Sequence, residues 1–251
     1  MNRNPTEQVY ETIGVEYASA RHADPRIENL VWAALGDART VVNVGAGTGN
    51  YEPTDRWVVA VEPAVTMFAQ RRVRTVPIVR AVAEALPFRD HTFDAALATL
   101  TLHHWRDFPA GLSEMRRVAR RQVIMLTEPA ISSRFWLADY FPEALLLASE
   151  VRAPSIADIA THLRLQSITP VPIPADCTDG FLGCYWRRPE VYLDPTVRAS
   201  MSSLAQLSPE VQQRGVELLM HDLRSGAWDA RYGHLRGLQE YDLGYRLVVA
   251  G

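Results

Sequence analysis

The sequence of 251 residues contains few cysteines, no excess of positive charge and no long apolar segment. Its two cysteines, Cys177 and Cys184, fit neither a zinc motif nor a CxxC redox pair, so we expect reduced thiols and no disulfide framework. The 26 basic and 29 acidic residues give a net charge of −3, whereas proteins that bind nucleic-acid phosphates usually carry a basic excess. We therefore expect no nucleic-acid partner.

No apolar run approaches the ~18 residues that a membrane-spanning helix needs. Residues 1–14 are polar and lack the apolar core of a signal peptide. We therefore expect a cytoplasmic protein without a membrane partner. No spacing of His, Asp and Glu indicates a metal site, so no metal is expected, and the sequence leaves the oligomeric state open.

Short apolar runs alternate with helical patterns through the first half of the chain. Continuous apolar strands separated by helices are typical of an α/β fold whose parallel sheet is covered on both faces. Asp24 and Pro25 suit the cap and the first turn of a helix. Strands are predicted at 40–44, 57–61, 76–79, 93–98 and 122–127, and helices at 25–35, 63–72 and 108–118.

The second half of the chain has a different pattern. Helices are predicted at 133–150 and 155–163, and strands at 166–173 and 245–250. A long insertion before a last strand usually builds a lid or a pocket wall. We therefore expect a single domain over 1–251, with substrate-lid insertions at 130–165 and 175–242.

A glycine-rich loop, Gly45-Ala46-Gly47-Thr48-Gly49, follows the first predicted strand. The dinucleotide fingerprint G-x-G-x-x-G would need a glycine where Asn50 stands. Glu62 ends the next strand, where its two oxygens can accept hydrogen bonds from both hydroxyls of a ribose. Nothing nearby resembles the phosphate-binding lysine of a P-loop, so an adenosine ligand without pyrophosphate is favoured over NAD.

These features, together with the run from Ala83 to Asp90 and the following Thr92-Phe93-Asp94, resemble class I S-adenosylmethionine (SAM)-dependent methyltransferases. Within that class they are similar to the methyltransferase type 11 group, which includes ubiquinone, menaquinone and biotin-pathway enzymes. The resemblance covers about residues 10–128. It implies SAM as cofactor and a Rossmann-like seven-stranded sheet in the order 3-2-1-4-5-7-6, with the last strand antiparallel. The runs at 177–190 and 237–246 resemble an actinobacterial subgroup of unassigned substrate.

The resemblance also implies a set of cofactor-binding residues. Glu62 is expected at the ribose, Glu84 at the adenine, and Tyr17 and Arg21 at the SAM carboxylate. Glu84 could instead cap a helix, and Tyr17 and Arg21 could pack an N-terminal helix. The full set is Tyr17, Arg21, Asn43, Gly45, Ala46, Gly47, Glu62, Pro63, Met67, Ala83, Glu84, Thr99 and Leu100.

Asn43 departs from the family pattern, which usually has Asp or Glu two residues before the first glycine. An amide can accept one hydrogen bond from the SAM ammonium, but it cannot balance the charge. This departure permits a weaker cofactor site.

The candidate catalytic residues follow the fourth predicted strand. There, His104 and secondly His103 could remove a proton from an acceptor, because an imidazole has a pKa close to neutral pH. Both could instead be structural. Farther along, Tyr185, Trp186 and Arg187 are predicted to bind a flat or anionic acceptor, or else to form the core of the lid.

We therefore expect an enzyme that transfers a methyl group from SAM to a small-molecule acceptor and releases S-adenosylhomocysteine (SAH). The chain lacks the Asn/Asp-Pro-Pro-Tyr type of motif that holds a flipped base in nucleic-acid amino methyltransferases. Two alternatives remain open. One is a tRNA or protein methyltransferase, and the other is a SAM-binding protein without methyl transfer, which Asn43 permits.

Overall fold

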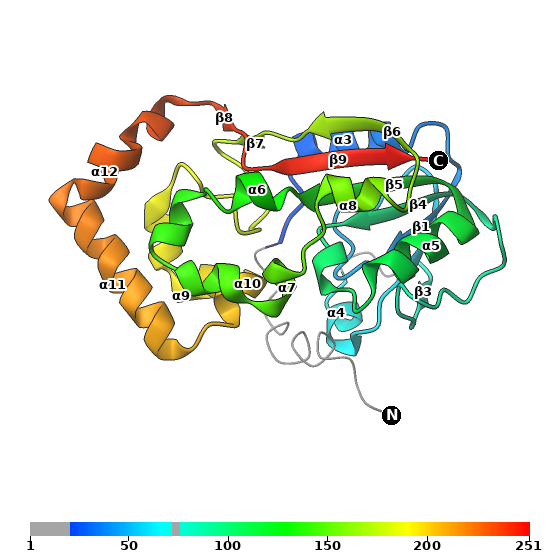
Figure 1. Ribbon diagram of the computed structural model, residues 1–251, viewed down its shortest axis with the longest axis horizontal. Coiled ribbons are helices and arrows are strands. Elements are labelled where there is room, and N and C mark those ends of the chain that lie inside the picture. The colour runs from blue at the N-terminus through cyan, green and yellow to red at the C-terminus, as the bar shows by residue number, and fades with distance from the viewer. Residues whose placement is uncertain (1–20, 72–75) are drawn as a thin grey trace.

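The computed structural model describes residues 21–71 and 76–251. They form a seven-stranded sheet in the order β3-β2-β1-β4-β5-β9-β6, and a second sheet of β7 and β8. Figure 1 shows the large sheet at one end of the molecule and the helices of the second half of the chain, α9 to α12, at the other. The predicted α/β class, strand order and antiparallel final strand are confirmed.

The strands of the large sheet pair in two directions. The first five are parallel to one another, whereas β9 is antiparallel to its neighbours β5 and β6. Their bounds are β1 Thr40–Val44, β2 Trp57–Val61, β3 Ile78–Val79, β4 Phe93–Thr99, β5 Ala119–Thr127, β6 Leu165–Pro170 and β9 Tyr245–Ala250. The small sheet consists of β7 Ile173–Pro174 and β8 Glu240–Tyr241.

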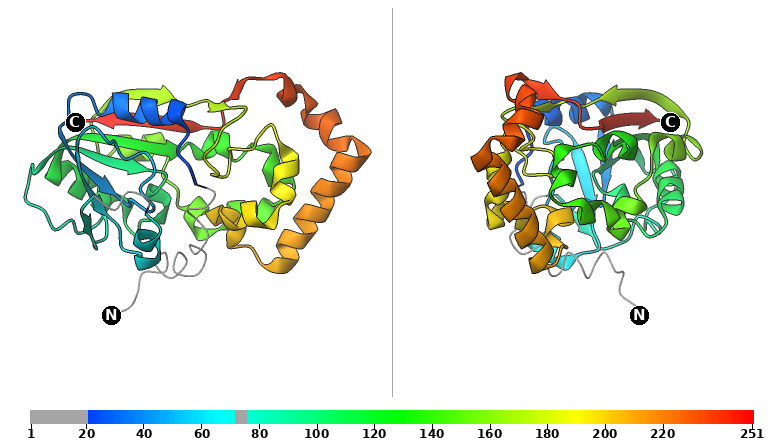
Figure 2. Two further views of the ribbon diagram at one scale, coloured as in Figure 1. Left: turned by 180° about the vertical axis from the view of Figure 1, so that it is seen from behind. Right: turned by 60° about the vertical axis from the view of Figure 1, so that its left-hand side comes forward.

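Both faces of the central strands of the large sheet are buried, whereas the edge strand β6 is exposed. Alternate residues of a strand point to opposite faces, so Val41 packs in the cluster that contains α3 (Pro25–Ala34), and Val42 in the cluster that contains α5 (Phe108–Val118) and α8 (Ile156–Ala160). Helix α3 lies behind the sheet in Figure 1 and in front of it in the left view of Figure 2. Burial on both sides explains why the strands read as continuous apolar runs.

The local signals at the start of α3 are confirmed. The Asp24 side chain accepts a hydrogen bond from the Arg26 amide at 3.0 Å, and Pro25 occupies the first turn. Pro25 costs no hydrogen bond there, because the first amides of a helix have no partner within it.

The prediction of one long helix at 133–150 is wrong. The chain instead forms α6 Pro129–Ser132, the 3₁₀ helices η3 Trp136–Asp139 and η4 Pro142–Leu146, and α7 Ala148–Val151. Pro142 has no amide hydrogen with which to continue a preceding helix. Trp136, Tyr140 and Phe141 are all buried, so the stretch is apolar because it packs on several sides rather than along one helical face.

Several other boundaries differ from the prediction. The strand expected at 76–79 begins at Ile78, the strand expected at 122–127 begins at Ala119, and the helix expected at 155–163 ends at Ala160. The helix expected at 63–72 is confined to α4 Val65–Ala69, and the strand expected at 166–173 ends at Pro170, so that the following β7 pairs with β8. The remaining helices are η2 Leu102–His104, η5 Pro189–Leu193, α9 Pro195–Ala199, α10 Ser202–Ala205, α11 Pro209–Ser225, α12 Ala227–Tyr232 and η6 Gly233–Gly237. None of the helices within 21–71 and 76–251 is long and apolar enough to cross a membrane.

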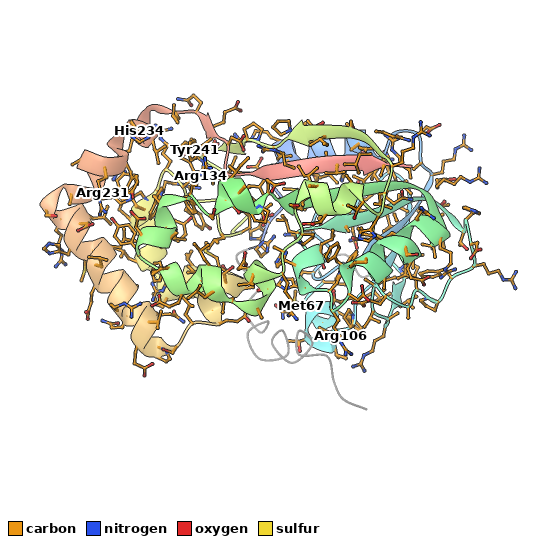
Figure 3. The ribbon with its side chains drawn as sticks, viewed as in Figure 1. Met67, Arg106, Arg134, Arg231, His234 and Tyr241 are labelled. Carbon is orange, nitrogen blue, oxygen red and sulfur yellow. The ribbon has the colours of Figure 1, made fainter. Side chains whose placement is uncertain are left out.

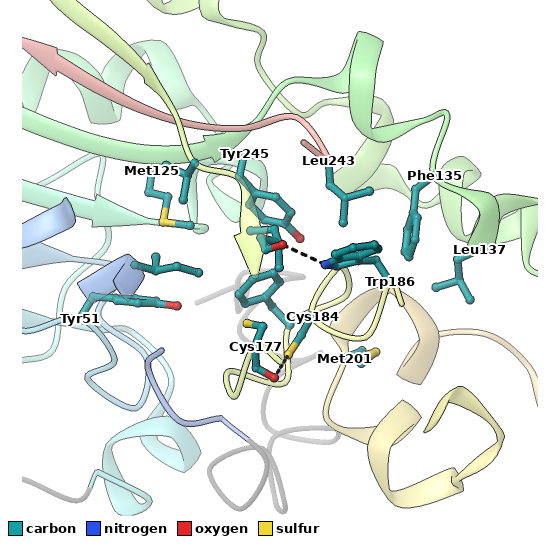
Figure 4. Packing of buried hydrophobic residues seen from close by; sticks show 14 of the residues in the cluster. Tyr51, Met125, Phe135, Leu137, Cys177, Cys184, Trp186, Met201, Leu243 and Tyr245 are labelled. Atoms are coloured by element: carbon teal, nitrogen blue, oxygen red, sulfur yellow. Dashed lines mark hydrogen bonds between the residues drawn. The ribbon is translucent and has the colours of Figure 1, made fainter. Parts of the chain in front are cut away.

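The second half of the chain has an aromatic core that is continuous with the α3 face of the sheet. Figure 4 shows this core extending from Tyr51 and Met125, beside the sheet, to Phe135. Trp186 is fully buried within it, and its indole N–H donates to the carbonyl of Ile173 at 2.9 Å. The insertions and the sheet therefore fold as parts of one hydrophobic unit.

Replacing Trp186 with alanine should lower the free energy of unfolding by about 3–5 kcal/mol, because it removes a large buried ring and leaves the Ile173 carbonyl without its donor. Urea denaturation followed by circular dichroism measures the change. Leu146→Ala is the control, since that side chain is 74% exposed and its loss should change the free energy by no more than about 0.5 kcal/mol. Equal effects of the two substitutions would contradict the prediction.

Candidate functional site

A cavity lies at the carboxyl ends of β1, β2 and β4. The chain passes from β1 to β2 and β3 before it returns on the other side of β1 as β4, and ligands of open parallel sheets bind at such a switch point. We call it the strand-end cavity. It encloses about 890 Å³, open solvent included. Twelve of the predicted residues line it, namely Arg21, Gly45, Ala46, Gly47, Glu62, Pro63, Met67, Ala83, Glu84, Thr99, Leu100 and His104.

Residues 45–47 of the glycine loop line this cavity with backbone atoms that no large side chain covers. The amides of Gly45 and Ala46 donate to the carbonyl of Val61 at 2.9 and 3.0 Å, which ties the loop to the end of β2. Gly45 has a φ of +70°, and a methyl group on its Cα would overlap the side chain of Thr101. Only glycine therefore fits both the turn and the close approach of η2.

Glu62 connects the end of β2 to the glycine loop. Its carboxylate is buried and accepts hydrogen bonds from the amide of Gly47 at 2.8 Å and from the amide of Ala64 at 2.9 Å. The acid thus lies in the cavity wall directly beside the loop, where its oxygens can accept hydrogen bonds from hydroxyl groups.

The structure places Asn43 behind the loop rather than in the cavity wall. Its side chain is fully buried and donates to Glu52 at 2.9 Å. Glu52 also forms a buried ion pair with Arg71, which in turn donates to the carbonyl of Gly47 at 3.3 Å. Burial raises the pKa of Glu52, and Arg71 opposes that shift.

An acid therefore does lie next to position 43, but the guanidinium of Arg71 balances its charge. Sequence reasoning missed both partners. Glu52 stands close after the glycine loop in the chain, and that spacing is the only sequence signal that could have indicated it.

The adenine side of the predicted site contains Met67 and Glu84, and both line the strand-end cavity. Met67 is the buried residue of α4 and is labelled in Figure 3. The Glu84 carboxylate accepts hydrogen bonds from the amides of Arg106 at 2.8 Å and Asp107 at 3.1 Å. Glu84 thus fixes the chain that leads into α5 and remains part of the wall, whereas the cap of α5 is Asp107.

A second cavity of about 820 Å³, open solvent included, adjoins the first. The two cavities share Arg21, Leu100 and His104 in their walls. The rest of the wall of the second cavity combines apolar side chains with polar ones. Its other lining residues are His103, Thr127, Ser132, Phe135, Leu145, Glu150, Phe181, Leu182, Gly183, Met201, Ser202, Ser203, Leu243 and Tyr245.

Leu100 stands at the junction in an unusual backbone conformation. Its φ is +51°, a left-handed value that a bulky residue rarely adopts. Its amide donates to the carbonyl of Met125 at 2.8 Å, which continues the pairing of β4 with β5 beyond the end of the strand. Strained residues of this kind cluster at ligand sites, because only a well-packed surrounding holds them in place.

His103 and His104 lie next to each other in η2, with ring centroids 3.8 Å apart. Burial lowers the pKa of His104 well below its ordinary value, and the neighbouring His103 lowers it further. Burial also lowers the pKa of His103, against the opposing effect of Glu150. Both imidazoles are therefore neutral at pH 7, a form that can accept a proton.

The predicted acceptor residues do not line either cavity among the residues described. Trp186 belongs to the aromatic core, and Tyr185 packs edge-on against Tyr192 with the guanidinium of Arg188 4.8 Å from its ring centre. Arg187 is half-buried and also lies outside both walls. The same loop reaches the second cavity a few residues earlier, at 181–183. Tyr17 lies outside the described residues, and no group of three or more potential metal ligands occurs within 21–71 and 76–251.

Fold and site together define a class of enzyme. A seven-stranded sheet with an antiparallel seventh strand, a glycine loop after β1 and an acid after β2 are the features of class I SAM-dependent methyltransferases. The glycine loop and the donor and acceptor groups of the strand-end cavity fit SAM, because bare backbone and a carboxylate lie side by side in its wall.

Comparison with known proteins agrees with this class. A family model described as a methyltransferase domain matches residues 42–127. A demethylmenaquinone methyltransferase of Mycolicibacterium vanbaalenii is 37% identical over 185 residues, which cover 72% of this chain and 69% of that protein. The same-named protein of Mycolicibacterium paratuberculosis is 31% identical over 159 residues, which cover 61% and 69%.

A solved structure extends the similarity to nearly the whole chain. The crystal structure of a protein of Anabaena variabilis, described as a methyltransferase from an antibiotic biosynthesis pathway, is 32% identical in sequence. It superimposes with a TM-score of 0.85 and covers 92% of this chain and 99% of that one. The chain belongs to the SAM-dependent methyltransferase family. It is an enzyme that transfers a methyl group from SAM.

The stability of the protein should fall as the pH is lowered from 7.5 to 5.5. In the unfolded chain a histidine binds a proton near pH ~6.5, whereas His104 stays neutral to a lower pH when folded. The unfolded state then gains protons that the folded state does not, at a cost of up to ~1.4 kcal/mol per pH unit for each such histidine.

Thermal unfolding at intervals across this range measures the slope. His104→Gln should give a shallower fall than the wild-type chain, because the substituted side chain does not titrate. If both proteins lost stability in parallel, the lowered pKa of His104 would not be the cause.

Proposed function

We propose that the strand-end cavity binds SAM, that the second cavity binds a small-molecule acceptor, and that methyl transfer takes place at their junction. The observation that carries this proposal is the wall of Arg21, Leu100 and His104 that the two cavities share. A group that passes from one ligand to the other must cross there.

The cofactor residues follow from the walls of the strand-end cavity. Gly45, Ala46 and Gly47 would lie along the methionine part of SAM, and Glu62 would accept hydrogen bonds from the ribose hydroxyls. Pro63, Met67, Ala83 and Glu84 would enclose the adenine, with Thr99 and Leu100 next to the sulfonium. When bound, SAM supplies an electrophilic methyl group, so the protein needs chiefly to align the ligands and exclude water.

His104 is the proposed general base, and His103 is the second candidate. His104 lines both cavities, whereas His103 lines only the second. The lowered pKa values keep both rings neutral, so His104 can accept a proton from an acceptor hydroxyl or amine as the methyl group is transferred. An acceptor that carries no such proton would need the ring only for positioning.

The acceptor is proposed to have an apolar body and one polar end. Phe135, Phe181 and Met201 offer apolar surface in the second cavity, while Glu150 and Ser203, which are hydrogen-bonded to each other at 3.0 Å, offer polar groups. An apolar cavity with a few polar groups is typical of small-molecule sites. The names of the relatives, which refer to demethylmenaquinone and to antibiotic biosynthesis, support such an acceptor.

The residue ranges 130–165 and 175–242 are proposed to serve as the substrate lid. Each contributes walls to the second cavity, the first through Ser132 and Glu150 and the second through 181–183 and 201–203. We propose that the enzyme works in the cytoplasm on a metabolite rather than on tRNA or protein. The net charge of −3 and the apolar side chains in the wall of the second cavity support this choice.

Replacing Glu62 with alanine should weaken the binding of SAH by roughly 1–3 kcal/mol, which is the usual cost of losing a hydrogen bond to a charged group. Isothermal titration calorimetry measures the change. Glu240→Ala, at an exposed position in the small sheet, is the control and should bind SAH like the wild-type chain. Unchanged affinity in Glu62→Ala would remove this residue from the site.

Replacing Ser202 with tryptophan should fill the second cavity and block methyl transfer while SAH still binds, because Ser202 lines only that cavity. The measurement uses SAM with a labelled methyl group, incubated with small-molecule, RNA and protein fractions of a cell extract. Ser225→Trp, on the exposed end of α11, is the control and should retain activity. Label in RNA or protein, or equal activity of both variants, would contradict the proposal.

A further inference from the structure

Asp179 is a fully buried carboxylate on the loop that follows β7. It accepts hydrogen bonds from Arg21 at 2.6 Å, from Asn50 at 3.4 Å and from the hydroxyl of Tyr51. These three donors all line the strand-end cavity. Burial and the nearby Asp179 raise the pKa of Tyr51 well above its ordinary value, so its hydroxyl remains a donor.

The same loop is joined to the start of α3 by further contacts. The amide of Thr178 donates to Asp24 at 3.3 Å, and Arg26 pairs with the exposed Asp176 at 2.7 Å. A few residues after Asp179, the loop lines the second cavity at 181–183. The short stretch 176–183 thus contacts residues that line the strand-end cavity and also forms part of the wall of the second cavity.

The other acids around the strand-end cavity have different tasks. Glu62 bonds the glycine loop, Glu84 bonds the chain that leads into α5, and the charge of Glu52 is balanced by Arg71. Asp179 does not itself line the cavity, but it forms an ion pair at 2.6 Å with Arg21, which does.

We propose that Asp179 is the positioning residue for the amino-acid end of SAM. Through its ion pair it holds the guanidinium of Arg21 in the wall of the cavity, where this group can bind the carboxylate of the cofactor. This inference rests on the proposed binding of SAM in the strand-end cavity. Asp179 belongs to the loop that also contributes residues 181–183 to the wall of the second cavity. The binding of SAM and the shape of the second cavity therefore depend on each other.

The test compares two ligands that share the same nucleoside. SAH carries the amino-acid end, whereas 5′-methylthioadenosine lacks it. Asp179→Asn should weaken SAH binding at least about tenfold, the loss expected when a charged hydrogen bond is removed, and should change the binding of 5′-methylthioadenosine less than about twofold. Asp176→Asn removes an exposed acid from the same loop and should leave both affinities unchanged.

The titrations have four informative outcomes. A selective loss of SAH affinity in Asp179→Asn supports the inference. Equal losses for both ligands would overturn it, because they would indicate a general role of Asp179 in the folding of the cavity, and no loss for either ligand would overturn it as well. Wild-type protein that binds neither ligand would instead overturn the proposed cofactor site itself, and the inference with it.

A measurement on the wild-type chain decides the question even if Asp179→Asn fails to fold. An SAH analogue that lacks only the α-carboxylate should bind more weakly than SAH, because Arg21 then has no anionic group of the ligand to bind. Equal affinity for the two compounds would overturn the inference.

Discussion

The parallel pairing of β1 with both β2 and β4 is the constraint on which the site depends. Because the chain leaves β1 in one direction and returns on its other side, the loops after these strands diverge and leave a crevice at the carboxyl edge of the sheet. The strand-end cavity occupies that crevice. Burial of β1 on both faces fixes its register, and with it the position of Gly45 against Val61.

Charge is distributed around this crevice in pairs. Glu52 is matched by Arg71 behind the glycine loop, and Asp179 by Arg21 at the boundary of the two cavities. An unpaired charge in such buried positions would be costly, so each acid comes with a cation or with several donors. The pair of Arg21 and Asp179 joins segments that are far apart in sequence, and it therefore links the segment before α3 to the loop after β7.

The parts of the fold whose apolar residues follow a clear helix or strand pattern were predicted from the sequence. Strand order, the capped start of α3 and the glycine loop follow from local patterns and from the resemblance to a known family. The helix predicted at 133–150 is wrong because an apolar segment that packs on several sides has the same composition as a buried helix. Pro142, which cannot continue a preceding helix, was the signal against it. Asp179 was not singled out, since its importance arises from contacts with residues such as Arg21 and Tyr51 that lie far from it in the chain.

The candidate site was predicted unevenly for a similar reason. Residues at strand ends are brought together by the fold itself, so the sequence indicated them. The second cavity is lined largely by residues of the second half of the chain, whose path the hydrophobic pattern does not reveal. Sequence reasoning therefore selected the aromatic pair Tyr185 and Trp186, whereas the nearby part of the wall consists of 181–183.

The continuity of the aromatic core with the sheet limits how this enzyme can admit its ligands. A lid can move as a rigid body only if its interface with the rest of the protein can open. Here Trp186, Tyr245 and Met125 belong to one buried cluster that joins the second half of the chain to the sheet. Parting them would expose apolar surface to water at about 25 cal/mol per Å². Entry and exit are therefore expected to rely on short loops at the rim and on side-chain rotations, with the bulk of the molecule staying closed throughout turnover.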